Sequence, residues 1–178
     1  MKIVLVKTIG FKPEELEKLS QATDLLETVI NTESFKLEVM RHTYTQPGGW
    51  FKRSRTLNAF RMTSLTPMQV YKKFMSGSER LEPHPDQEAD IHITIDRRDA
   101  GDVLGYTYAS TPMQWVYSSF FGRATIADIA SNIAHEYCHK LGFTHESNYT
   151  KLRQYTVPYA LGYIVKELAK GYLNGKKI

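Results

Sequence analysis

Three histidines and one glutamate stand close together in the last third of the chain, in the order His135, Glu136, His139 and His145. Residues four apart on an α-helix lie one turn above one another, so His135 and His139 can direct their imidazoles at one ion. Gly142 can adopt a positive φ at little steric cost, which ends the helix and lets His145 approach from another direction. Three nitrogen ligands leave a fourth position for water, which is typical of a catalytic metal site.

Glu136 lies next to the two helical ligands but about 80° round the helix from their midline. Its carboxylate is therefore expected beside a bound ion rather than on it. Zinc lowers the pKa of its bound water towards about 7, and a carboxylate in this place can take the proton and later pass it to a leaving amine. The pattern predicts a zinc-dependent enzyme that hydrolyses peptide bonds.

The residues around these ligands predict which side of the helix is buried. At about 100° per residue, one broad arc is apolar, and His135 and His139 fall nearly opposite it, together with Asp128 and Asn132. The apolar arc consists of Ile126, Ile129, Ala130, Ile133, Ala134, Tyr137 and Leu141. We expect this arc to face the core and the ligand pair to face a cleft. Cys138, at the margin of the arc, is expected to be buried.

The extended pattern His-Glu-x-x-His-x-x-Gly-x-x-His, which runs from His135 to His145, resembles the hallmark of the metzincin zinc metallopeptidases. The resemblance implies that the three histidines bind one catalytic zinc ion, that Glu136 is the general base and acid, and that Gly142 makes the turn. It also implies a twisted, mostly parallel sheet over an active-site helix, followed by a small lower lobe that ends in a C-terminal helix.

The sequence departs from the metzincin pattern in one respect. Metzincins carry a methionine-containing turn beneath the zinc, soon after the third histidine, whereas all six methionines of this chain precede the motif. The best-placed substitute is the segment 156–159, in which Val157 or Pro158 would have to supply the apolar floor. The departure bears on membership of a subfamily more than on zinc binding, because the methionine is not a ligand.

The resemblance implies two further parts of the site. Some metzincins use a tyrosine just after the turn as an extra ligand or to stabilise the oxyanion; Tyr159 is the first candidate, ahead of Tyr155 and Tyr163. In the family, substrate lies antiparallel to the edge strand above the zinc, which would here be the segment 103–108. Backbone groups of an edge strand can pair with an extended peptide. The substrate-binding residues expected on it are Leu104, Gly105 and Tyr106.

The remaining elements must position this site. Strands are expected at 3–9, 35–39, 91–95, 103–108 and 115–121, and helices at 13–31, 66–75, 125–141 and 158–173. This order predicts an α/β (α+β) fold, in which a twisted, mixed and mostly parallel sheet carries the active-site helix and a small C-terminal helical lobe. We expect one zincin-like catalytic domain over residues 1–178, with an upper lobe at 1–141 and a lower lobe at 142–178.

The composition is that of an ordinary globular protein, with 42% hydrophobic and 24% charged residues among 178. No segment approaches the roughly 20 apolar residues of a membrane span, so no membrane partner is expected. The apolar run at the start is too short for a signal peptide and is interrupted by Lys7. Cys138 is the only cysteine, which excludes an internal disulfide and favours a reducing, cytoplasmic compartment.

The mildly basic charge, +4, is concentrated in the run 52–55 and in the tail, and we interpret it as solvated charge. The expected partner is a protein or peptide substrate rather than nucleic acid, and the sequence does not determine the oligomeric state. Two alternatives stay open. The third ligand can be a glutamate, Glu146 or Glu167, with His145 incidental. The chain can also be a non-catalytic, metal-stabilised binding module.

Overall fold

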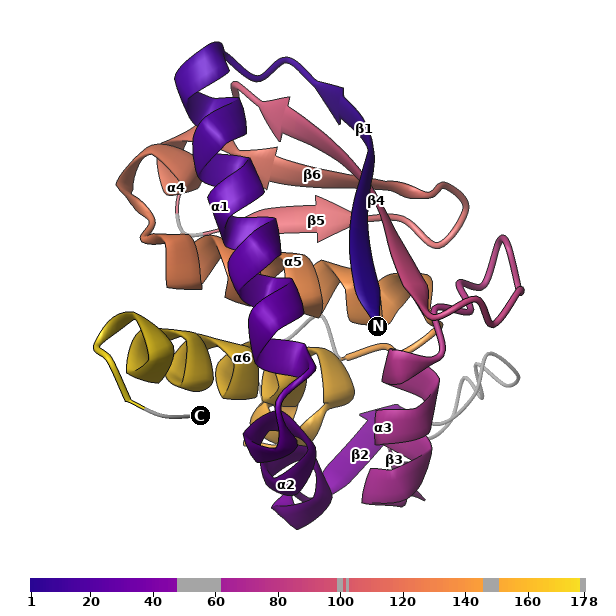
Figure 1. Ribbon diagram of the computed structural model, residues 1–178. Coiled ribbons are helices and arrows are strands. Elements are labelled where there is room, and N and C mark those ends of the chain that lie inside the picture. Colours follow the sequence, from indigo (N-terminus) through magenta and orange to yellow (C-terminus); the bar gives the residue numbers. More distant parts are fainter. Residues whose placement is uncertain (48–61, 99–100, 102, 146–150, 177–178) are drawn as a thin grey trace.

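The computed structural model describes residues 1–47, 62–98, 101, 103–145 and 151–176. Its larger sheet has four strands in the order β1-β4-β6-β5 (Figure 1). The strands are β1 (Lys2–Ile9), β4 (Glu88–Asp96), β5 (Gly105–Thr107) and β6 (Met113–Tyr117). β1, β4 and β6 pair in parallel, and β5 pairs antiparallel with β6. The short β5 is therefore an edge strand, at the end of the sheet opposite β1.

The described residues form six α-helices and one short 3-10 helix. These are α1 (Pro13–Ile30), α2 (Glu33–Arg41), α3 (Pro67–Met75), α4 (Ser118–Arg123), α5 (Ile126–Lys140), η1 (Arg153–Tyr155) and α6 (Val157–Leu173). The mixed, mostly parallel sheet and these helices confirm the α/β (α+β) class. Among the described residues, no helix is both long and apolar enough to cross a membrane.

The core lies between the larger sheet and the helices α1, α5 and α6. From Glu88 to Ile95, every second residue of β4 is buried, whereas the residues between them are only half-buried, so the helices cover one face of the sheet. In Figure 1, α1 runs across this face, with α5 and then α6 below the sheet. The largest fully buried side chains of these elements are Tyr137, Leu19, Leu26, Ile30, Ile91, Ile93, Ile129 and Ile133. This core supports α5 from the side opposite its histidines.

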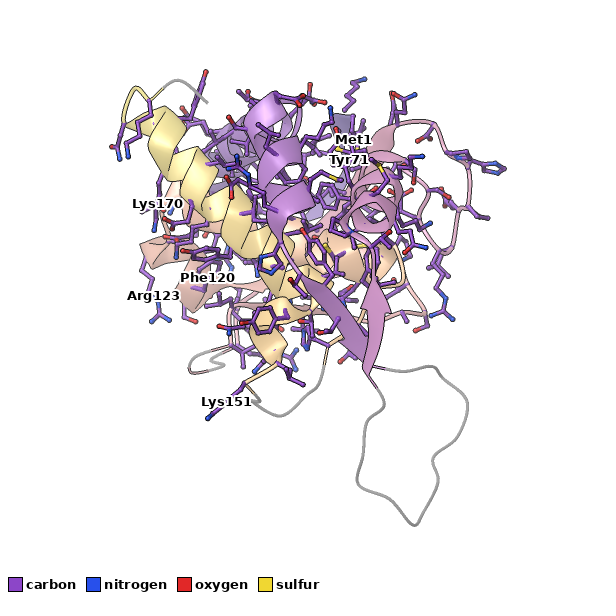
Figure 2. The ribbon with its side chains drawn as sticks, turned by 90° about the horizontal axis from the view of Figure 1, so that it is seen from below. Met1, Tyr71, Phe120, Arg123, Lys151 and Lys170 are labelled. Atoms are coloured by element: carbon purple, nitrogen blue, oxygen red, sulfur yellow. The ribbon has the colours of Figure 1, made fainter. Side chains whose placement is uncertain are left out.

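A second sheet of two antiparallel strands, β2 (Tyr44–Pro47) and β3 (Met62–Leu65), was not expected from the sequence. It stands apart from the larger sheet when the protein is viewed from below (Figure 2). A single parallel bridge between Thr45 and Thr156 connects it to the start of α6. The basic run 52–55, which follows β2 in the sequence, lies outside the described residues.

Two predicted strands are wrong. The segment 35–39 is part of the helix α2, because Thr32 caps that helix by accepting the N–H of Phe35. Phe35 and Val39, four residues apart, are buried, while Leu37 is 44% exposed. The strand predicted at 115–121 ends at Tyr117, and the next residues form α4. Phe120 and Phe121 are both buried, which a strand with alternating faces does not allow on a sheet covered from one side.

Candidate metal centre

The helix α5 begins and ends where the sequence predicts. Thr125 and Asp128 form a reciprocal capping box at its start. At its end, the N–H of Gly142 donates to the carbonyl of His139, and the N–H of Phe143 donates to that of Cys138. This is a Schellman motif, which needs a residue in the left-handed region after the helix, and Gly142 has a φ of +93°. The chain then turns back over the helix.

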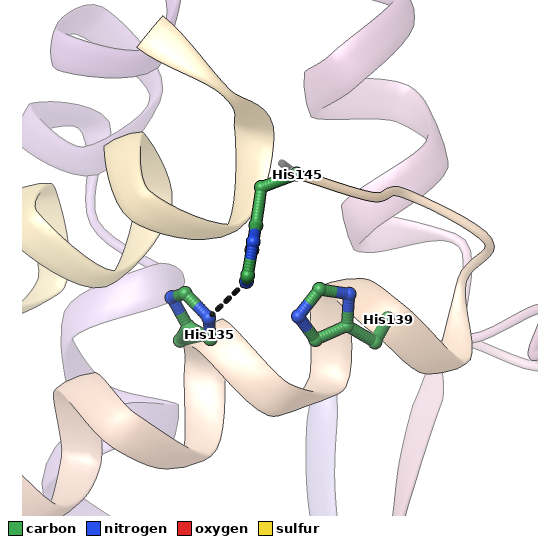
Figure 3. Close-up of side chains that lie close together, drawn as sticks. All are labelled: His135, His139 and His145. Atoms are coloured by element: carbon green, nitrogen blue, oxygen red, sulfur yellow. Dashed lines mark hydrogen bonds between the residues drawn. The ribbon is translucent and has the colours of Figure 1, made fainter. Parts of the chain in front are cut away.

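This turn brings the third histidine to the other two (Figure 3). One possible ligand nitrogen from each of His135, His139 and His145 lies within 4.8 Å of the others, so the group can hold a metal ion. The Nε2 atoms of His135 and His145 are 3.3 Å apart. Two nitrogens bound at 2.0–2.1 Å to one tetrahedral ion must lie about 3.3 Å apart. This pair already has the spacing that such an ion requires.

Two of the three imidazole rings are also oriented by hydrogen bonds to the backbone. The Nδ1 atom of His139 lies 2.9 Å from the carbonyl oxygen of Phe143, which leaves Nε2 free for an ion. His135 hydrogen-bonds the backbone of Pro158, which has only a carbonyl oxygen to offer. Burial, together with the neighbouring histidines, lowers the pKa of His135 well below its usual range, and burial lowers that of His139 to about 4. Both imidazoles are therefore neutral at pH 7, as metal ligands must be.

Glu136 lines the same cleft as the histidines and is buried, with 5% of its surface exposed. Burial raises the pKa of its carboxyl to about 8, against the opposing charge of Lys140. A buried carboxyl group without a compensating contact costs free energy of folding. Within the described residues, this carboxyl group has no hydrogen-bond or ion-pair partner. It can therefore interact with a molecule bound in the cleft.

The segment proposed to replace the methionine turn lies beside the histidines. Val157 and Pro158 are buried at the start of α6, and Tyr159 follows them. The ring of Tyr159 lies 4.6 Å from that of His135 and 4.8 Å from that of His145, measured between centroids. Burial raises the pKa of Tyr159, so its hydroxyl stays protonated at neutral pH.

The two other tyrosines considered for this role lie elsewhere. Tyr155 packs against His42, with 6.0 Å between the ring centroids, and does not line the cleft. Tyr163 lines the cleft but is 64% exposed. Of the three, Tyr159 is the tyrosine whose ring contacts the described histidine group, edge-on to His135 and tilted against His145. The alternative ligand Glu167 is exposed and pairs with Lys170 at 3.0 Å, and Glu146 lies outside the described residues.

The predicted substrate strand borders the cleft. Leu104, Gly105 and Tyr106 all line it, and the last two belong to β5. The carbonyl of Leu104 accepts the N–H of Tyr117 from β6. In an antiparallel pair, the backbone groups of successive residues point to alternate edges, so those of Gly105 and Thr107 point away from β6. These two residues, rather than Leu104 and Tyr106, carry the outward backbone groups of the strand.

Three polar residues of α5, spaced by four, follow this strand: Asn132, Glu136 and Lys140. All three are buried. The amide oxygen of Asn132 lies 3.1 Å from the position that a Cβ atom would take at Gly105, so a side chain larger than hydrogen does not fit there without movement. Asn132 therefore lies directly against the edge strand at Gly105.

Lys140 anchors the loop between β5 and β6. Its Nζ atom donates to the carbonyl oxygens of Tyr108, Thr111 and Met113 at 3.2, 2.7 and 2.7 Å. Only 6% of the residue is exposed. Sequence analysis did not identify Lys140 as part of the site. The signal in the sequence was its spacing of four residues from Glu136 and eight from Asn132, which places all three side chains on one face of the helix.

The cleft between β5, α5 and α6 has a volume of about 960 Å³. It holds all three histidines, Glu136 and Tyr159, and it is large enough for an extended peptide segment. Arg153, which precedes α6, also lines it and was not identified from the sequence. No feature of the sequence around Arg153 distinguishes it from the other cationic residues.

No protein-family model matches the chain, and no curated protein or solved structure matches it either. The relation to the metzincins therefore remains a prediction from the motif. What the fold and the site define is a mixed α/β protein with a group of three histidines, able to hold a metal ion, in an open cleft.

Proposed function

We propose that this chain is a zinc-dependent peptidase of the metzincin type. The observation that carries the proposal is that His135, His139 and His145 converge in a cleft that also contains the buried carboxyl group of Glu136, which has no partner among the described residues. Three neutral nitrogens are a ligand set that suits zinc, and three protein ligands are typical of catalytic zinc sites. When bound, zinc polarises the scissile carbonyl and lowers the pKa of water.

Glu136 supplies the proton transfer in this proposal. Its carboxylate takes a proton from the attacking water and gives it to the leaving nitrogen. The positive charge of Lys140 favours the ionised carboxylate that the first step needs. The low exposure of Glu136 limits competition from bulk solvent for the same proton.

Tyr159 and the edge strand orient the substrate. The hydroxyl of Tyr159, whose ring contacts His135 and His145, can donate a hydrogen bond to the oxyanion that forms at the scissile carbonyl. The outward backbone groups of Gly105 and Thr107 can pair with an extended peptide. The substrate would then run along β5 with its scissile bond above the histidines.

A metal-stabilised binding module without catalysis is the alternative from another class. Such a protein has no need for a buried carboxyl group beside its metal ligands, because that group only lowers stability. Salt-dependent binding to duplex DNA, together with no cleavage of any peptide, would favour this alternative.

The proposal is tested by metal analysis of the purified protein and by incubation with a peptide library, followed by mass spectrometry, with and without a chelator. We expect about one zinc per chain and chelator-sensitive cleavage. Glu136→Gln should keep the zinc and lose turnover by at least about 1,000-fold, within the range typical of lost proton transfer and positioning. Glu167→Gln, which removes an exposed carboxylate outside the site, is the matched control. Normal cleavage by Glu136→Gln would refute the mechanism.

A further inference from the structure

One arginine reaches the cleft from the segment before α6. Arg153 is the first residue of η1, and its carbonyl accepts both the N–H and the hydroxyl of Thr156. Its guanidinium carbon lies 4.4 Å from the centroid of the Tyr159 ring. The same ring also contacts His135 and His145, so Tyr159 is a neighbour of both the guanidinium and the histidine group.

Arg153 has hydrogen-bonding capacity that the described protein does not use. Its side chain hydrogen-bonds Tyr159, but its Nε atom is buried and has no hydrogen-bond partner. The ion pairs within the described part of the chain all involve other residues. A buried donor without an acceptor costs free energy, and a guanidinium cannot remove that cost by losing its proton. Arg153 also lines the cleft, where its side chain is a cationic donor for an anionic ligand.

The charges along the cleft favour such a ligand. Three cationic side chains line it, from Arg80, Arg153 and Lys166, whereas Glu136 is the only carboxylate among the described lining residues. Lys166 is paired with Asp128 at 2.7 Å, so its charge is largely balanced. A bound divalent cation would add to the positive potential. Clefts lined by one sign of charge concentrate ligands of the opposite sign.

We propose that Arg153 is a specificity-determining residue, which binds a carboxylate of the substrate next to the scissile bond. The substrates would be peptides with an aspartate or glutamate near that bond, or with a free C-terminal carboxylate there. This inference rests on the proposed peptidase function for the position of the bond. A guanidinium can present two parallel N–H groups to one carboxylate, which lysine cannot do.

The test separates binding from cleavage. Binding is measured by fluorescence anisotropy on the Glu136→Gln protein in buffer that contains zinc, with four fluorescein-labelled peptide pools. All pools share one randomised design with two fixed positions. These positions are both Glu or both Gln, and the C-terminus is either free or amidated, which gives the four pools. We expect the carboxylate-bearing pools to bind about tenfold or more tightly, the range for a hydrogen bond to a charged group. The Glu and C-terminal arms show which carboxylate is recognised.

Variants assign this preference to one residue. Arg153→Gln should reduce the preference to about twofold or less, and Arg153→Lys should keep only part of it. Arg123→Gln, which removes the same charge from a side chain that points away from the body of the protein (Figure 2), should keep all of it. Thermal melts verify that each variant is folded. Equal preference in Arg153→Gln and Arg123→Gln, or no preference in the parent protein, would overturn the inference.

The proposed peptidase function is tested separately, by measuring cleavage of the same peptide pools by the parent protein, which retains Glu136. Binding that depends on Arg153 without any cleavage would support carboxylate recognition and refute the peptidase. Cleavage without a preference for carboxylates would support the peptidase and refute the role of Arg153.

Discussion

The Nε2 atoms of His135 and His145 lie 3.3 Å apart, although ten positions separate the two residues in the sequence. The Schellman motif at Gly142 produces this approach, because it ends α5 and directs the chain back over the helix. Two histidines from a helix and a third from the returning chain can enclose an ion from one side only. The opposite side remains open to the cleft.

Removal of the third histidine should therefore release the metal. For His145→Ala we expect a loss of zinc affinity greater than the roughly 10–100-fold that follows loss of an outer-shell contact. Competition with a chromogenic chelator measures this loss. Glu167→Gln should retain normal affinity, since Glu167 is exposed and paired with Lys170. Full retention of zinc by His145→Ala would instead favour a glutamate as the third ligand.

Tyr159→Phe tests the hydroxyl of the tyrosine whose ring contacts His135 and His145. If that hydroxyl stabilises an oxyanion, its removal should lower kcat about 100-fold and leave zinc content and KM nearly unchanged. Tyr163→Phe, which removes the hydroxyl of an exposed tyrosine of the same cleft, should retain nearly full activity. Steady-state kinetics on one cleaved peptide compares the two. Normal kcat in Tyr159→Phe would show that this ring only packs against the ligands.

Lys140→Met should lower the free energy of unfolding by about 2–4 kcal/mol. The change leaves the carbonyls of Tyr108, Thr111 and Met113 without a charged donor, and part of that loss is recovered by water. Urea denaturation provides the measurement. Lys170→Met, on the surface (Figure 2), removes only an exposed ion pair and should change stability by less than about 1 kcal/mol. Equal effects of the two changes would contradict an anchoring role for Lys140.

Gly105→Ala should disturb the edge strand. An added Cβ atom would meet the carbonyl oxygen of Trp115 at 2.5 Å, and backbone cannot move aside as a flexible side chain can. Such overpacking costs about 1–3 kcal/mol, and we expect KM for peptides to rise as β5 moves. Gly122→Ala is the control, since a Cβ atom there meets nothing within 4 Å. The proposed role of β5 fails if Gly105→Ala destabilises the protein yet leaves KM and kcat unchanged.

Asp128→Asn should remove a pH-dependent part of the stability. Burial opposes ionisation of Asp128, but hydrogen bonds from Lys166 and Thr125 outweigh it and lower the pKa to about 2. Because this folded value lies below the unfolded value of about 3.9, the stabilisation is fully present above pH 4 and is lost as the pH falls through 2.

The expected size of this contribution at neutral pH is about 2 kcal/mol. Urea denaturation of the parent protein and of Asp128→Asn between pH 2.5 and 6 measures it. The difference in unfolding free energy should shrink towards the acid end of this range. A difference that does not change with pH would mean that the hydrogen bonds of Asp128, and not its charge, stabilise the start of α5.

Local signals in the sequence account for most elements and for the ligand group. The spacing of His135 and His139, the cap at Thr125 and the glycine at 142 each act within one or two turns of the chain, so they can be recognised without knowledge of the fold. The segment 35–39 shows the limit of such signals. Its apolar residues suit a short strand as well as a helix, and the cap at Thr32, with the burial of Phe35 and Val39 on one face, decides for the helix.

The sequence by itself determined the α/β (α+β) class, the helix that carries His135, Glu136 and His139, and the turn that frees His145. Only the tertiary structure decided that β5 is the edge strand, that Lys140 is buried under three carbonyls and that Arg153 stacks on Tyr159. The physical reason is the range of the interactions. Periodicity, caps and a glycine turn depend on neighbours along the chain, whereas strand order and the partners of a buried charge depend on residues that only the packed core brings together.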